Sequence, residues 1–163
     1  MNSDSSANAN GTDRRVAFVQ STWHESVVEQ CRTSFVEEIS SYGIQPEQID
    51  VFRVPGAFEI PLLAQRAARS GRYDVVVAAG LVVDGGIYRH EFVAASVLDA
   101  LMRAQLDSDV PVISAVLTPH HFHEHQDHLS FFHRHFVVKG AEAARACIGA
   151  LAALDQLAAA TAQ

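Results

Sequence analysis

The segment of residues 73–79 (YDVVVAA) limits the possible folds most, because it is apolar almost throughout. A strand with one face in water alternates apolar and polar residues, whereas a strand covered on both faces reads as a nearly continuous apolar run. The short length of the segment and its three valines favour a strand over a helix. We therefore expect the central strand of a parallel sheet that has helices on both faces.

Strand-like and helix-like patterns alternate along the rest of the chain. Short apolar runs predict three further strands, over residues 15–20, 48–54 and 110–117. Helical spacing predicts helices over residues 24–42, 58–70, 90–106 and 139–160, with Gly43 and Gly71 just past the first two. Strands that alternate with helices form parallel sheets through right-handed crossovers. The predicted fold is α/β, a three-layer α/β/α sandwich around a four-stranded parallel sheet.

Length and composition fit one domain of this kind. The chain has 163 residues, of which 48% are hydrophobic but only 8% are aromatic. Its apolar content is therefore mostly Ala, Val, Leu and Ile, which fill packed helices and parallel strands. Residues 1–13 are polar, without a basic start or an apolar run, which predicts a disordered tail rather than a targeting peptide. We expect a single domain over residues 14–163.

Charge and cysteine content argue against several classes of protein. The formal net charge of -7 gives no electrostatic reason to bind nucleic acid. No uninterrupted run of about 18 apolar residues is present, so no membrane-spanning helix is expected. Cys31 and Cys147 are the only cysteines, and both lie in helix-like segments. They indicate neither a disulfide framework nor a cysteine zinc site, and the expected compartment is the cytoplasm.

Polar and aromatic residues follow the predicted strands at the points where these strands end. In an open parallel sheet these ends share one rim, and ligands bind beyond it. The loops at this rim are residues 21–24, 55–59, 80–89 and the segment from Thr118 onward. The residues of interest in or shortly after these loops are Trp23, Phe58, Glu59, Arg89, His90 and His128.

The first two loops permit both a binding and a purely structural interpretation. Trp23, the only tryptophan, offers a broad face for stacking on a planar ring, but a tryptophan is usually well packed whatever its role. In residues 54–61 (VPGAFEIP), a glycine and an alanine allow close approach of the backbone, and Glu59 is an acceptor for hydroxyl groups. The same loop is also a plausible turn in which Glu59 opens a helix.

Residues 84–90 (DGGIYRH) follow the central strand and precede a helix. Free backbone amides near a helix N-terminus bind anions such as phosphate, although the segment matches neither the Rossmann nor the P-loop pattern. Arg89 and His90 are placed to act as a proton donor or phosphate partner. Alternatively, they are polar residues that open a solvated helix.

Seven of the nine histidines lie in residues 120–135. On a helix, His121 and His125, or Glu124 and His128, would have the i, i+4 spacing of metal ligands. No HExxH pattern occurs, and a His-rich tract suggests metal binding without establishing it. We favour a polar loop over residues 118–135, or a subunit interface with a phosphate-binding histidine, over a metal site.

Four motifs in order resemble those of the 6,7-dimethyl-8-ribityllumazine synthase family. They are Trp23 after the first strand, VPGAFEIP after the second, GGIYRHEFV after the third and VKGAEAA before the last helix. The tryptophan and the His-rich segment are similar to the type II branch. The resemblance implies a flavodoxin-like fold and a transferase of riboflavin biosynthesis. It implies no metal or organic cofactor, and a pentamer-based homo-oligomer, for which the type II likeness favours a decamer over a 60-subunit shell.

The implied reaction joins 5-amino-6-(D-ribitylamino)uracil to 3,4-dihydroxy-2-butanone 4-phosphate, with loss of phosphate and water. The resemblance places Trp23 against the pyrimidine ring, and it assigns the polar edge and the ribityl chain to Ala57, Phe58 and Glu59. It also implies that Leu81, Val82 and Val83 line the pocket, that Ser114 comes from an adjacent chain, and that backbone amides of Gly86 and Ile87 hold phosphate.

The sequence departs from the family pattern at two places. Arg89 stands where most members have a proton-shuttling histidine, and His90 follows one residue later. The segment between Thr118 and Lys139 is longer than usual, so His128, with Arg134 in reserve, is the candidate for the phosphate-binding arginine. The lost histidine keeps a second hypothesis open, a flavin or lumazine storage protein with little turnover. The third is a His-rich metal-binding module.

Overall fold

The computed structural model describes residues 13–83, 89–119 and 126–162, without the side chain of His128. The strands are β1 (Val16–Ser21), β2 (Ile49–Val54), β3 (Val75–Leu81) and β4 (Val112–Leu117). The helices are α1 (Glu25–Ser40), α2 (Ile60–Arg69), α3 (His90–Ser108) and α4 (Gln126–Thr161), with short 3-10 turns η2 (Pro46–Gln48) and η3 (Ala57–Glu59). All strand pairs are parallel, in the order β2-β1-β3-β4.

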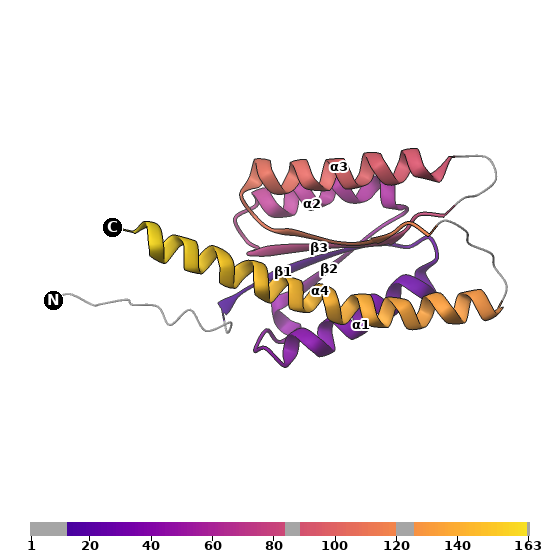
Figure 1. Cartoon of the computed structure of the whole chain (residues 1–163), viewed down its shortest axis with the longest axis horizontal. Coiled ribbons are helices and arrows are strands. Elements are labelled where there is room, and N and C mark those ends of the chain that lie inside the picture. The colour runs from indigo at the N-terminus through magenta and orange to yellow at the C-terminus, as the bar shows by residue number, and fades with distance from the viewer. Residues whose placement is uncertain (1–12, 84–88, 120–125, 163) are drawn as a thin grey trace.

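The sheet is the middle of three layers, which confirms the predicted α/β/α sandwich. Helices α2 and α3 cover one face, and α1 and α4 cover the other (Figure 1). Strand β3 is buried along its whole length. Val75 and Val77 point into the core on the α1 and α4 side, and Val76 and Ala78 into the core on the α2 and α3 side. The continuous apolar run therefore supplies both cores.

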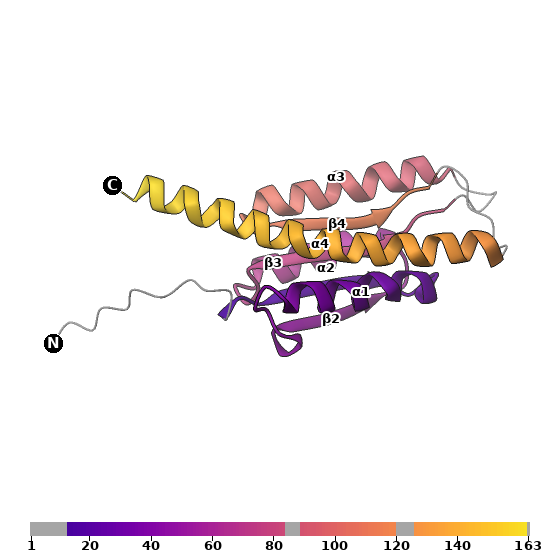
Figure 2. The ribbon, with the colours of Figure 1, turned by 60° about the horizontal axis from the view of Figure 1, so that its bottom comes forward.

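The carboxyl ends of the four strands meet at one end of the molecule, next to the beginnings of α3 and α4 (Figures 1 and 2). Backbone hydrogen bonds join the chain there: the amide of Trp23 donates to Pro55 O (2.9 Å), and the amide of Val82 donates to Leu117 O (2.8 Å). Strand β3 runs to Leu81, so Gly80 and Leu81 belong to the strand and not to the loop expected from residue 80. The predicted convergence of the strand ends is confirmed, whereas residues 84–88 and 120–125 of the predicted loops lie outside the described residues.

Helix α4 corrects the prediction of a polar loop up to residue 135. The helix begins at Gln126, well before the expected start at residue 139. Its first turns have a buried stripe, because Phe132 and Phe136, four residues apart, lie in the core beside α1. The histidines between these aromatic residues belong to the less buried sides of the same helix.

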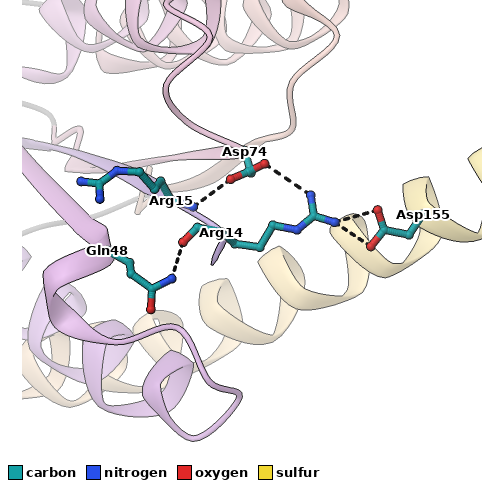
Figure 3. Close-up of polar contacts among 5 residues, drawn as sticks. All are labelled: Arg14, Arg15, Gln48, Asp74 and Asp155. Carbon is teal, nitrogen blue, oxygen red and sulfur yellow. Dashed lines mark hydrogen bonds and ion pairs between the residues drawn. The ribbon is translucent and has the colours of Figure 1, made fainter. Parts of the chain in front are cut away.

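A network of polar contacts ties the starts of the strands together at the opposite end of the molecule (Figure 3). The guanidinium of Arg14 donates to both carboxylate oxygens of Asp155 in α4, each at 2.7 Å, and lies 3.4 Å from Asp74. Asp74 accepts the amide of Arg15 (2.8 Å), and Gln48 donates to the carbonyl of Arg14 (2.8 Å). The first strand is thus anchored to three other segments.

Both cysteines lie in the core between α1 and α4, and both are free thiols. Burial raises the pKa of each thiol to about 12. Among the described helices, none combines the length and the apolar character needed to cross a membrane.

Candidate active site

Trp23 lies on the rim, held by the loop that follows β2. Its amide donates to Pro55 O, and the preceding amide of Thr22 donates to Val54 O (2.8 Å) and to Pro55 O (3.1 Å). The next residue, His24, has φ 58° and ψ 37°, a left-handed conformation that turns the chain into α1. Trp23 is 65% exposed. The residue is therefore not enclosed in the core, and its exposure leaves room for a ligand.

The loop after β2 forms the 3-10 turn η3 before α2. Glu59 accepts the amide of Gly56 through Oε2 (2.9 Å), and its own amide donates to Gly56 O (3.2 Å). The glutamate therefore does open the helical segment, as the structural interpretation expected. Its side chain is nevertheless exposed at the rim. Phe58 is 65% exposed and borders a hollow of about 280 Å³ between α2 and α3.

Small residues form the floor of the rim beneath these loops. A Cβ atom added at Gly80 would lie 3.1 Å from Ser21 Oγ and 3.2 Å from the Cδ1 atom of Ile60. Ala57 is buried beside this position. The end of β3 therefore packs directly beneath the loops that carry Trp23 and Glu59.

Arg89 and His90 have different environments at the start of α3. The Arg89 side chain is 74% exposed and lies over the ring of Phe92, 5.5 Å from its centroid. The His90 side chain is only 15% exposed. Its Nδ1 is buried and lies 3.4 Å from a carboxylate oxygen of Glu91, without a hydrogen-bond partner among the described residues. The imidazole is thus held inside the fold, whereas the guanidinium reaches into solvent.

Comparison with known proteins shows the family to which this chain belongs. The family model described as 6,7-dimethyl-8-ribityllumazine synthase matches residues 13–155. The chain belongs to the 6,7-dimethyl-8-ribityllumazine synthase family. A relative of that name from Rhodococcus erythropolis is 58% identical over 144 residues, 88% of this chain and 93% of the relative. The relatives named 6,7-dimethyl-8-ribityllumazine synthase 2 include one from Bradyrhizobium diazoefficiens, 56% identical over 144 residues, 88% of this chain and 86% of the relative.

The other residues that the lumazine synthase resemblance assigned are buried, lie away from the rim or fall outside the described residues. Leu81 and Val82 are 5% and 6% exposed, and their side chains belong to the two cores, whereas Val83 is partly buried. Ser114 is exposed in the middle of β4, an edge strand. One strand residue advances about 3.3 Å, so its Cα atom lies several ångströms below the rim of its own chain.

The phosphate-binding candidates are described only in part. Gly86 and Ile87 lie outside the described residues, as do His121, Glu124 and His125, and so does the side chain of His128. Arg134 is exposed on α4 and borders a shallow hollow of about 190 Å³ with Phe131, His135 and Val138. Among the described residues, no three His, Cys, Asp or Glu side chains are grouped to hold a metal ion.

A polar network behind the rim was not predicted from the sequence. Gln20, fully buried in β1, donates to Glu29 of α1 (2.9 Å). Arg53 at the end of β2 pairs with Glu25 (3.1 Å) and approaches Glu29 (3.7 Å), and Arg32 also pairs with Glu29. These contacts hold the start of α1 against β1 and β2, and hence fix the loop that carries Trp23. A glutamine inside an apolar strand was the one signal that could have revealed them.

Proposed function

We propose that this chain condenses 5-amino-6-(D-ribitylamino)uracil with 3,4-dihydroxy-2-butanone 4-phosphate to give 6,7-dimethyl-8-ribityllumazine, phosphate and water. The observation that carries the proposal is the exposed indole of Trp23 beside η3, at the rim where the family motifs converge. A flat heterocycle stacks well on such a face. The exposed Phe58 and Glu59 and the buried Ala57 are then the neighbours that read its polar edge and its ribityl chain.

Catalysis in this proposal rests on positioning and proton transfer. The amine of one substrate and the ketone of the other form an imine with loss of water, phosphate is eliminated, and attack of the ribitylamino nitrogen on the remaining carbonyl closes the ring with loss of a second water. Holding both substrates together supplies much of the acceleration. We assign the proton transfers to His90, because an imidazole can accept and donate a proton and its Nδ1 has no hydrogen-bond partner among the described residues. We assign an electrostatic role to the exposed guanidinium of Arg89.

Phosphate binding is assigned to the backbone amides of Gly86 and Ile87 and to the side chain of His128, with Arg134 in reserve. His128 lies in the first turn of α4, and Arg134 follows on the same helix. In Figures 1 and 2 α4 begins at the end of the molecule where the strands end and extends beyond them, and a helix N-terminus also favours an anion. Arg134 is about 9 Å further along the helix axis than His128 at 1.5 Å per residue, and it stays the reserve candidate.

We propose a homo-oligomer built from pentamers, in this branch a decamer, with sites between neighbouring chains. The exposed apolar residues of α3 support this assembly: Phe92, Leu98, Met102 and Leu106. The position of Ser114 on the exposed edge strand also agrees with a contribution to the site of a neighbour. The mass in solution by light scattering tests the assembly, since each chain contributes 17.7 kDa. The two free cysteines are consistent with a cytoplasmic enzyme.

The decisive experiment measures the fluorescence of newly formed lumazine when both substrates are mixed with the protein. The condensation also proceeds slowly without enzyme, so the expected result is a rate well above the spontaneous one. Equal rates would reject the enzyme, and tight lumazine binding without acceleration would identify a storage protein instead.

Two variants assign the proton transfers within this experiment. His90→Ala should lower kcat by about 10²-fold, the usual contribution of a general acid or base, and should change the pH profile. Arg89→Ala should mainly raise the KM for the phosphate substrate. If Arg89→Ala lowers kcat while His90→Ala leaves it unchanged, the assignment to His90 is wrong.

A further inference from the structure

Gly56 lies at the N-terminal side of η3, under the ring of Trp23. A Cβ atom added at Gly56 would lie 2.6 Å from both Cε3 and Cζ3 of the indole. Real Cβ atoms essentially never come within 3.0 Å of another heavy atom. The six-membered part of the indole therefore occupies the space that any other residue type at position 56 would fill.

The backbone of Gly56 does not need a glycine for conformational reasons. Its φ of -125° and ψ of 177° are extended values that every residue type adopts. Its amide donates to Glu59 Oε2, and an alanine has the same amide donor, although its Cβ atom would lie 3.2 Å from that oxygen, a smaller conflict than the one with the indole. The requirement for glycine at this position is therefore spatial, and its spatial partner is Trp23.

The backbone of Trp23 is held in place and leaves only the side chain free to avoid an added methyl group. Hydrogen bonds from the amides of Thr22 and Trp23 to Pro55 O fix its backbone beside position 56. On its other side, His24 is held in the left-handed region as α1 begins, and its carbonyl accepts the amides of Val27 and Val28. Only rotation of the side chain would relieve the clash, and that rotation would remove the indole from its present plane.

We infer that Gly56 is a positioning residue: it seats the indole of Trp23 so that the opposite ring face is presented to the heterocyclic substrate. This inference rests on the proposed function for the identity of the ligand. The packing of the Trp23 indole on Gly56, which we call the seat, is a property of the free protein. It also changes the explanation of the glycine in VPGAFEIP. The space above Gly56 is used by the tryptophan and not by a closely approaching ligand.

The seat is tested in the free protein with Gly56→Ala. Trp23 is the only tryptophan, so the near-ultraviolet circular dichroism of indole and the anisotropy of its fluorescence report on this side chain alone. Both signals should fall in Gly56→Ala and stay unchanged in Gly149→Ala, where an added Cβ meets nothing within 4 Å. Unchanged indole signals in a folded Gly56→Ala protein would overturn the seat, whether or not the protein is an enzyme.

A double-mutant cycle with Trp23→Ala tests the consequence for the substrate. With Trp23 present, Gly56→Ala should raise the KM for the ribitylaminouracil roughly tenfold, as expected for loss of one stacking contact, and should leave kcat and the other KM nearly unchanged. With Trp23→Ala present, the same substitution should have no further effect. An equal tenfold rise in both backgrounds would overturn the inference, because the glycine would then be needed by the ligand itself.

Inactivity of the wild-type protein would reject the proposed function but would leave the spectroscopic result on the seat intact. Conversely, an active wild type with additive variants would reject the seat and keep the function. The two failures are therefore distinguishable.

Discussion

Replacement of Gly140 by alanine gives the sharpest test of how the helices pack. Gly140 is buried in α4 where this helix crosses α1. A Cβ atom at this position would lie 2.3 Å from the carbonyl oxygen of Cys31, 2.9 Å from the amide nitrogen of Phe35 and 2.9 Å from the Cβ atom of Ser34. Ordinary van der Waals contacts begin at 3.4 Å, so the methyl group requires about 1 Å of additional separation.

Two effects of opposite sign determine the stability of this variant. Alanine is the better helix former by about 1 kcal/mol. Against this gain, two of the three obstructing atoms are backbone atoms that cannot move aside alone, so α1 and α4 must separate. A radial gap of 0.5–1 Å forfeits about a quarter to a half of each dispersion contact, and overpacking costs about 1–3 kcal/mol. Taking the upper value, we expect Gly140→Ala to lower the free energy of unfolding by about 2 kcal/mol.

Gly149→Ala is the matched control, because Gly149 is an exposed residue of the same helix with open space around it. This variant should gain up to about 1 kcal/mol. Urea unfolding of both variants at one protein concentration measures the difference, the concentration being fixed because assembly also stabilises the fold. The close crossing of α1 and α4 is refuted if Gly140→Ala unfolds at the same urea concentration as Gly149→Ala or at a higher one.

Three further predictions follow from polar and thiol groups. Alanine substitutions of Arg14 and Asp155 in a double-mutant cycle should give a coupling of about 0.5–1 kcal/mol, since one guanidinium nitrogen contacts both carboxylate oxygens but the pair is partly exposed. A zero coupling would remove the pair as an anchor of α4. The hydrogen bond from Tyr73, followed by that from Arg15, lowers the pKa of Asp50 in the folded protein. The stabilisation that Asp50 contributes is therefore complete above its unfolded pKa near 3.9 and is lost as the pH falls through the lower folded pKa. In urea unfolding, Asp50→Asn should make the free energy of unfolding depend less on pH in this acidic range. Both cysteines should resist alkylation in the native protein and react on unfolding, because burial raises each thiol pKa to about 12; rapid native labelling would contradict their burial.

The sheet was predictable because its information is local. The continuous apolar run of β3 is recognisable within seven residues, and the order of strands and helices along the chain then restricts the topology. Pro111 stands just before β4, as a proline without an amide donor must. The rim followed in turn, since parallel strands bring their carboxyl ends together whatever the side chains are.

The first turns of α4 were missed because their composition concealed their period. Histidine dominates residues 120–135, and a polar tract without an evident stripe predicts a loop. The stripe is nevertheless present: Leu129, Phe132 and Phe136 continue at helical spacing into Gly140 and Ala143, and all five pack on the α1 side. The start of α4 is therefore determined by its contact with α1 and not by the composition of the segment.

Two kinds of glycine show which structural roles can be predicted from the sequence and which cannot. Gly43 and Gly71 were recognisable as helix ends, and both have positive φ, 96° and 73°, a requirement set by the local backbone alone. Gly56 and Gly140 lie within family motifs, but neither has a positive φ. Each is needed because a segment distant in the chain occupies the place of its Cβ atom. A glycine of the second kind becomes interpretable only when its partner is known, so the binding loop and the helix crossing required the structure.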